Sequence, residues 1–139
     1  MVRVPYKAFP DKYATFLYSA MLPVHLALPY PNAPRTKRFE AVIDSGASRC
    51  IFHADIGRFL GLDMKMGATE TTQGIGGPSE IYLHDVKLYI PGGPVIIKAG
   101  FKESLPIAGL LGMDGFFEHF VVTFRHVSLE CELDREYRA

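Results

Sequence analysis

The sequence contains the stretch Ala41-Val42-Ile43-Asp44-Ser45-Gly46-Ala47-Ser48. Its first three residues are apolar and two of them are β-branched, which predicts a short buried strand. This strand leads directly into an acidic residue, a hydroxyl and a glycine. A carboxylate at the end of a buried strand is costly unless hydrogen bonds or chemistry make use of it. Asp44 is therefore the first candidate for a functional residue.

The bulk composition indicates one soluble globular domain over residues 1–139. Of these residues, 48% are hydrophobic and 22% are charged, which suits a single domain with its own core. Lys and Arg total 15, and Asp and Glu total 15, so the net charge is zero. Bulk charge therefore gives no indication of a nucleic-acid or anionic-membrane partner. A near-neutral charge also permits copies of the chain to associate.

The two cysteines, Cys50 and Cys131, are too few for a disulfide framework and have no metal-ligand neighbours at short spacing. We interpret them as reduced and mostly buried thiols, which favours a cytoplasmic location. No signal or membrane segment is evident, because Pro23, His25 and Pro29 interrupt the apolar residues 13–30. The chain can still be a piece of a longer protein.

Short strand patterns dominate the chain. Alternating or β-branched apolar residues predict strands over 13–28, 39–44, 50–52, 64–73, 81–90, 95–101, 120–124 and 127–133. Residues 1–12 indicate a loose arm or a short edge strand, and Pro23 indicates a bulge or a sheet edge. Because no repeat and no βαβ rhythm is present, the sequence predicts an all-β fold with a closed or folded-over sheet.

One or two short helices complete this prediction. Residues 54–60 place Ile56, Phe59 and Leu60 on one helical face, and Gly61 follows as the helix end. We expect this helix to pack beside the sheet.

Asp114 stands before a second short apolar segment that reaches His119. Its side chain can accept hydrogen bonds from the free N–H groups that begin a helix. We therefore expect Asp114 to cap a helix or serve another structural role, and not to act as a second catalytic acid.

A glycine-rich turn separates the strand patterns 64–73 and 81–90. It reads Gly74-Ile75-Gly76-Gly77 and is followed by Pro78. Two strand-like runs joined by such a tip predict a β-hairpin. The turn lacks the spacing of a dinucleotide fingerprint and the lysine of a P-loop, so no cofactor is indicated. A plain solvent-exposed turn is the alternative interpretation.

Other catalytic patterns are missing from the sequence. The histidines form no short ligand pair, so no metal site is predicted. Ser45 does not lie in a Gly-x-Ser-x-Gly nucleophile elbow. For Asp44, the structural alternative is an unrelated all-β domain in which the carboxylate only caps a turn.

The Asp44 stretch has a companion further along the chain. Residues 107–112 read Ile-Ala-Gly-Leu-Leu-Gly, continue with Met-Asp-Gly-Phe-Phe, and lead to Val-Val-Thr-Phe at 121–124. The Asp-Ser-Gly motif, a glycine-tipped hairpin and an apolar-apolar-Gly element thus follow one another in this order. From about residue 15 to 133, the chain resembles the retropepsin-like aspartic proteases, particularly their single-lobed bacterial members.

This resemblance implies a single-lobe acid-protease barrel in which Asp44 is catalytic. It implies that the hairpin tip is a mobile flap that contacts substrate, through Gly74, Ile75, Gly76 and Gly77. It also implies that the catalytic loop is supported by Ser45, Gly46, Ala47 and Ser48, and that a structural second motif is formed by Leu110, Leu111 and Gly112. Pro78 stands where the retroviral pattern has an aromatic or apolar residue. By the same resemblance, residues 127–133 and 1–9 can join a subunit interface.

Aspartic proteolysis needs two carboxylates about 3 Å apart that share one proton. The aspartates of the chain are Asp11, Asp44, Asp55, Asp63, Asp85, Asp114 and Asp134. Of these, only Asp44 is followed by Ser/Thr-Gly. The dyad must then come from two chains, and we hypothesise a two-fold homodimer that hydrolyses a peptide or protein substrate. The alternative is a catalytically silent dimer of the same fold that acts as a peptide-binding or scaffold domain.

Overall fold

Ten β-strands make up most of the regular structure in the computed structural model, which describes residues 1–10, 16–73 and 77–137. The strands are β1 (Val2–Pro10), β2 (Phe16–Ala27), β3 (Phe39–Ile43), β4 (Ile51–His53), β5 (Ala68–Thr72), β6 (Ser79–Tyr89), β7 (Val95–Lys102), β8 (Gly109–Leu111), β9 (Phe120–Arg125) and β10 (Glu130–Arg135). The helical elements are α1 (Ala54–Phe59) and the short 3-10 helices η1 (Met64–Met66) and η2 (Phe117–His119). The all-β prediction with short helices is confirmed.

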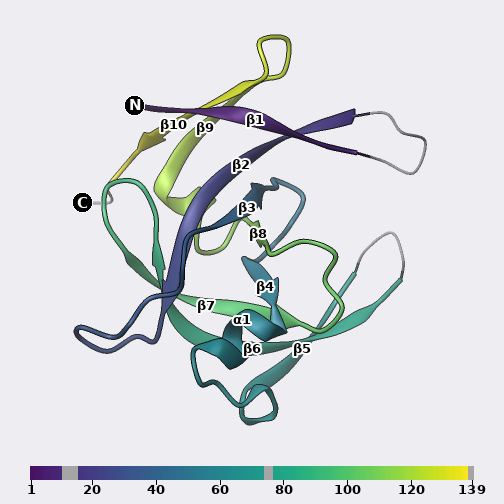
Figure 1. The fold of residues 1–139 in the computed structure, drawn as a ribbon, viewed down its shortest axis with the longest axis vertical. Coiled ribbons are helices and arrows are strands. Elements are labelled where there is room, and N and C mark those ends of the chain that lie inside the picture. The colour runs from purple at the N-terminus through teal and green to yellow at the C-terminus, as the bar shows by residue number, and fades with distance from the viewer. Residues whose placement is uncertain (11–15, 74–76, 138–139) are drawn as a thin grey trace.

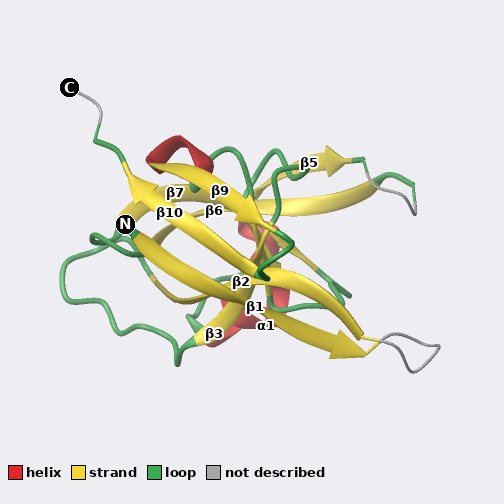
Figure 2. Ribbon diagram, turned by 90° about the horizontal axis from the view of Figure 1, so that it is seen from above, coloured by secondary structure: helices red, strands yellow, loops and turns green. Residues whose placement is uncertain are grey.

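The strands form one sheet that folds back on itself (Figure 1). Their order is β5-β6-β7-β4-β8-β3-β2-β1-β10-β9, with an additional pairing between β6 and β2. Strand β2 makes this closure, because Met21–Val24 pair with β3 while His25–Ala27 pair with β6. Two pairings are parallel, those of β3 with β8 and of β4 with β7. Seen from above, β9, β10, β1 and β2 lie side by side (Figure 2).

Strand β2 follows the alternation that its sequence predicts. Leu22, Val24 and Leu26 are buried, with exposed fractions of 4% or less. Pro23 pairs with β3, but it lies between the part of β2 that pairs with β1 and the part that pairs with β6. The missing N–H of this proline is therefore placed at a local sheet edge, as its position in the pattern predicts.

The first residues of the chain form the long strand β1. Its beginning, Val2–Pro5, pairs with β10, and its end, Tyr6–Pro10, pairs with β2. The segment is thus neither a loose arm nor a short edge strand. The sequence pattern there is weak because Val4 is the only deeply buried side chain among residues 1–8, so the pairing partners define the strand.

Helix α1 forms where it is predicted, and Ile56 and Leu60 of the predicted apolar face pack against the core, but Phe59 does not. Phe59 is 75% exposed, whereas Ala54 and Gly57 are buried. A Cβ atom at Gly57 would lie 2.6 Å from Met64 Cε and 3.0 Å from the Phe101 ring. Small residues therefore bring this helix close to the sheet, and the large side chain of Phe59 is left outside. The exposure of Phe59 could not be read from the positions of the large apolar residues.

The predicted hairpin on either side of the glycine-rich turn is present as β5 and β6, paired from Ala68–Leu83 to Thr72–Ser79. The first strand begins at Ala68 and not at residue 64. The reason is local, because the Asp63 side chain accepts a hydrogen bond from the Lys65 N–H and caps η1.

The last strand, β10, also begins later than its alternating pattern predicts. Val127 is fully exposed in the turn between β9 and β10. The Leu129 N–H donates to the His126 carbonyl, and Leu129 has a φ of 56°. This left-handed residue ends the turn, so pairing with β9 begins only at Glu130.

Asp114 does not cap the short helix that follows it. Helix η2 has Phe116 at its N-cap position, without a side-chain capping bond. The Glu118 carboxylate accepts a hydrogen bond from the Gly115 N–H instead. The Asp114 side chain forms an ion pair with Arg49, so its role is structural but of another kind than capping.

Both cysteines are free and buried. Cys50 directly precedes β4, and Cys131 lies in β10. Burial raises the pKa of Cys50 to about 12 and that of Cys131 to about 11. Both groups are therefore neutral apolar fillers near neutral pH. Across residues 1–10, 16–73 and 77–137, no helix has the length and apolar character needed to cross a membrane.

Candidate active site

The Asp44 carboxylate lies in a tight loop directly after β3. We call residues 44–48 the Asp44 loop. The Asp44 N–H donates to the Leu111 carbonyl at 3.0 Å, so the β3–β8 ladder extends to this residue. The Gly46 N–H donates to Asp44 Oδ1 at 2.8 Å, and the Ala47 N–H donates to the Asp44 carbonyl at 3.2 Å. The half-buried carboxylate is thus oriented by backbone groups of its own turn.

Gly46 leaves room for this close approach. A Cβ atom at position 46 would lie 3.2 Å from Asp44 Oδ1, tighter than an ordinary contact. A side chain there would crowd the oxygen that the Gly46 N–H binds. Without a side chain at residue 46, the backbone donor and the carboxylate meet without this crowding.

The second motif, Leu110-Leu111-Gly112, packs directly against the Asp44 loop. Strand β8 runs parallel to β3, with Val42 opposite Leu110 and Ile43 opposite Leu111. A Cβ atom at Gly112 would lie 2.3 Å from the Arg49 carbonyl oxygen and 2.6 Å from that of Ala47. The loop can therefore rest on this position only because Gly112 lacks a side chain.

Two backbone bonds fasten the loop just beyond Gly112. The Met113 N–H donates to the Ala47 carbonyl at 2.8 Å, and the Asp114 N–H donates to the Ser48 carbonyl at 3.0 Å. The structure thus joins two segments that lie about 65 residues apart in the sequence, as the Arg49–Asp114 separation shows. These bonds hold the loop in one conformation without using any side chain of the loop.

The structure describes some of the remaining predicted site residues but not all of them. Ser45 and Ser48 are exposed, and Ala47 is half-buried beside them. Gly77 has a φ of 100° with open space around it, as a glycine turn allows. The other predicted flap residues, Gly74, Ile75 and Gly76, lie outside the described residues.

Arg49 is a functional candidate that the sequence does not reveal. Its Nη1 lies 3.1 Å from Asp114 Oδ2, and its Nε donates to the Glu70 carboxylate on β5. One guanidinium therefore connects the Asp44 loop with the β5–β6 hairpin. No local pattern marks this residue, because its partners lie 21 and 65 positions away.

Cys50 fills the space behind the loop. Its Sγ donates to the Asp114 carbonyl at 3.4 Å, and a Cβ at Gly115 would lie 3.3 Å from this sulfur. Burial is the main cause of its raised pKa, with the nearby Asp114 carboxylate adding to it. The thiol therefore packs as a neutral group and offers no nucleophile to the site.

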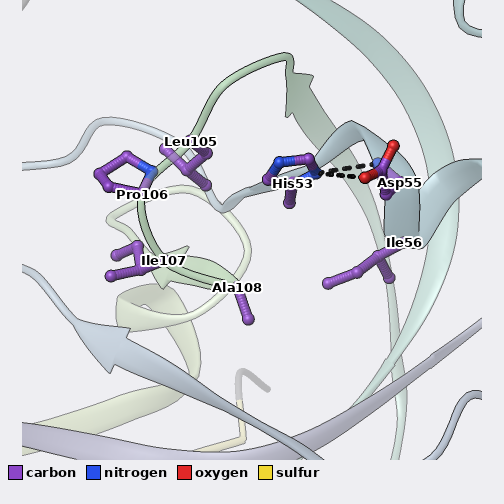
Figure 3. A pocket seen from close by; sticks show the side chains of 7 residues that line it. All are labelled: His53, Asp55, Ile56, Leu105, Pro106, Ile107 and Ala108. Carbon is purple, nitrogen blue, oxygen red and sulfur yellow. Dashed lines mark hydrogen bonds and ion pairs between the residues drawn. The ribbon is translucent and has the colours of Figure 1, made fainter.

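An open cavity of about 370 Å³ lies beside α1 and does not include Asp44 among its lining residues (Figure 3). Its walls come from the residues around the start of α1 and from the segment before β8, namely His53, Asp55, Ile56, Leu105, Pro106, Ile107 and Ala108. His53 Nδ1 accepts a hydrogen bond from the Asp55 N–H at 3.0 Å. In a single chain this cavity is separate from the Asp44 site.

The arrangement supplies one oriented carboxylate with a well-defined environment. Asp114, the acid next to the second motif, is engaged by Arg49. In the parts of the chain that the structure describes, no three His, Cys, Asp or Glu side chains form a group that could hold a metal ion. Among the described residues, the carboxylate that the Asp44 turn presents is thus a single one.

Comparisons with known proteins address the fold. No protein-family model and no curated protein matches the chain. Among solved structures, the chain is similar to a retropepsin-like aspartic protease from Rickettsia conorii, with a TM-score of 0.62 and 18% sequence identity. The match covers 95% of this chain and 88% of that protein. The chain therefore has the retropepsin-like fold.

Proposed function

We propose that the protein is an aspartic endopeptidase that acts as a homodimer, with Asp44 of each subunit forming the catalytic dyad. The observation that supports this proposal most directly is the structure of the Asp44 loop. A single Asp-Ser-Gly turn is oriented by its own backbone and rests on Gly112 within a retropepsin-like fold. A chain with one such loop supplies one acid, and the reaction needs two.

The mechanism follows from two like charges held close together. Two carboxylates about 3 Å apart cannot both be ionised, so the dyad holds one shared proton. One Asp44 accepts a proton from the attacking water, while the other donates its proton to the scissile carbonyl oxygen. The two groups titrate as a unit, and no covalent enzyme intermediate forms.

Several features of the single chain support association at this loop. Ser45 and Gly46 are exposed at the site, and Met113, the neighbour of Gly112, is 51% exposed although it is apolar. A second subunit packed against this face would cover these groups and bring the carboxylates together. The proposed role of the Ser45 hydroxyl is to bond across the two-fold axis and align the two loops.

The proposed substrate is an extended peptide held between the dyad and the β5–β6 hairpins. These hairpins are the proposed flaps, with contacts through Gly74, Ile75, Gly76 and Gly77. Because both cysteines are free thiols, we place the protein in a reducing compartment, the cytoplasm.

The test is cleavage of a peptide library by the full chain and by Asp44→Asn, with Asp85→Asn as the matched control. Asp85 is exposed on β6 beyond the residues that pair with β5, and it forms an ion pair with Lys98 of β7, so its loss leaves the Asp44 turn and the β5–β6 pairing intact. We expect Asp44→Asn to abolish cleavage and Asp85→Asn to preserve it. Cleavage that survives Asp44→Asn overturns the proposed mechanism.

Sedimentation of the full chain with a statine-type peptide inhibitor tests the dimer. We expect two chains per inhibitor, because each contributes one half of the site. A saturated complex with one chain contradicts the shared dyad. Peptide binding to a dimer that shows no turnover would instead identify the silent scaffold domain.

A further inference from the structure

Arg49 lies where three segments of the fold meet. It follows the Asp44 loop and precedes β4, while Glu70 lies on β5 and Asp114 follows Gly112. The Arg49 side chain is 24% exposed, compared with 42% for Glu70 and 54% for Asp114. The arginine is therefore the most buried member of this three-residue ion-pair group, which we call the Arg49 junction.

The two ends of the Arg49 junction are fixed to different degrees. The Asp114 end is also held by the backbone, since Arg49 and Asp114 form a parallel β-bridge and the Asp114 N–H donates to Ser48. The Glu70 end lies on β5, which is the edge strand of the sheet and pairs with β6 alone. Of the ion pairs among the described residues, Arg49–Glu70 is the one that joins β5 to the Asp44 loop.

The guanidinium geometry suits this task. Arg49 uses Nε for Glu70 and Nη1 for Asp114, so two neighbouring nitrogens of one planar group serve two carboxylates. A lysine presents a compact point charge with rotatable donors on a flexible stem, so it does not fix the positions of two partners in this way. The side chain thus transmits the fixed position of the Asp114 end to the hairpin.

We propose that Arg49 is a positioning residue that holds the β5–β6 hairpin at a set distance from Asp44 and thereby controls the binding of extended peptides. This role rests on the proposed protease function. An extended peptide must enter between the hairpin and the Asp44 loop. A hairpin held near its substrate-bound position has a larger binding-competent fraction, and the apparent affinity follows that fraction.

The first test measures the hairpin directly and needs no activity. Hydrogen exchange is compared for the full chain, Glu70→Gln and the control Asp85→Asn, on the amides of Ala68–Thr72. We expect exchange in this strand to accelerate by up to about fivefold in Glu70→Gln, since a partly exposed ion pair is worth at most that factor. The β9–β10 hairpin is the internal reference and should not change.

Salt provides a second measurement on the unmodified chain. At 1 M NaCl the Debye length falls to about 3 Å, which weakens the partly exposed Arg49–Glu70 pair, so exchange in β5 of the full chain should move towards that of Glu70→Gln. The variant itself should respond little to salt. Unchanged β5 exchange in Glu70→Gln overturns the positioning role, and so does equal acceleration in the β9–β10 reference, which indicates global destabilisation.

Kinetics then separates positioning from chemistry. We expect Glu70→Gln to raise KM by up to about fivefold with little change in kcat, because the dyad is untouched. Arg49→Met should behave similarly, and the double variant should be no worse than either single one. A purely kcat effect contradicts the proposal. If the hairpin loosens as expected while the full chain cleaves no peptide, the positioning role stands and the protease function fails.

Discussion

The loop that carries Asp44 and the β5–β6 hairpin are held in place by different kinds of interaction. The loop is fixed by a backbone hydrogen bond to the Leu111 carbonyl, by bonds from the Met113 and Asp114 N–H groups, and by the contact with Gly112. The outer strand of the hairpin, β5, lies at the edge of the sheet, pairs with β6 alone, and is linked to that loop by the Arg49–Glu70 ion pair. Backbone bonds within a sheet resist salt and pH, whereas a partly exposed ion pair responds to both.

This difference suits the two tasks that the proposed reaction requires. A dyad works only if its carboxylates are held within a fraction of an ångström, which a loop braced by backbone bonds can achieve. A substrate-covering hairpin must instead open and close, which needs a weak and reversible link. The three predictions below test this contrast, beginning with the largest expected effect.

Replacing a glycine by alanine should lower the free energy of unfolding much more beside the Asp44 loop than in the hairpin. In Gly112→Ala the new Cβ would lie 2.3 Å from the Arg49 carbonyl oxygen, so the backbone must shift. We expect the free energy of unfolding to fall by about 3 kcal/mol and cleavage to be lost. Denaturant unfolding at fixed chain concentration measures this change.

Gly77→Ala is the matched variant in the hairpin. Gly77 has a φ of 100° but open space around it, so the cost is limited to backbone strain of about 1 kcal/mol. Cleavage by this variant should be retained at a reduced level. Equal losses in the two variants would show that the loop is no more constrained than the hairpin.

The burial of Cys50 next to the Asp44 loop should affect the free energy of unfolding at alkaline pH. Burial raises the pKa of Cys50 from an ordinary value of 9.0 to about 12. The unfolded chain therefore loses this thiol proton first, so the stabilisation is fully present below about pH 9 and is lost as the pH rises towards 12. We expect Cys50→Ala to flatten the fall in unfolding free energy between pH 9 and 11, by at most about 1.4 kcal/mol per pH unit.

Cys131→Ala serves as the comparison for this measurement. The pKa of Cys131 is raised to about 11, again mainly by burial, in the sheet of β1, β10 and β9. Its removal should flatten the curve over a narrower pH range. Parallel curves for the full chain and Cys50→Ala would mean that water reaches the space behind the Asp44 loop.

Local patterns predicted the parts of this fold that depend on neighbouring residues. The apolar strand before Asp44, the alternation in β2 and the glycine-tipped hairpin strands all follow from side chains close in sequence. The order of the Asp-Ser-Gly motif, the glycine-tipped hairpin and the Leu-Leu-Gly motif indicated the fold by resemblance to the retropepsin-like proteases. In the structure the backbones of the two motifs pack directly on one another.

The missed features depend on partners that are distant in the sequence or on a single backbone angle. Strand β1 exists because β2 and β10 pair with it, and its own pattern is weak. The exposed Phe59 follows from the packing of Gly57 against Phe101. The late start of β10 follows from the left-handed conformation of Leu129. Arg49 was missed for the first reason, since both of its carboxylate partners lie far along the chain.

The smallest expected effect concerns the second carboxylate of the Arg49 junction. Asp114→Asn removes the ion pair with Arg49 but keeps the Asp114 N–H bond to the Ser48 carbonyl and the β-bridge to Arg49. We expect the free energy of unfolding to fall by no more than about 1 kcal/mol, because the Asp114 side chain is half exposed and the ion pair is screened. Cleavage should persist, and hydrogen exchange of the Met113 and Asp114 amides, which donate to the loop, should stay slow. The same neutralisation at Glu70 should loosen β5, because no other described ion pair fastens that strand to the loop. If Asp114→Asn instead frees the loop while Glu70→Gln leaves the hairpin unchanged, then the ion pair braces the loop, and the division between a backbone-held acid and a side-chain-held hairpin is wrong.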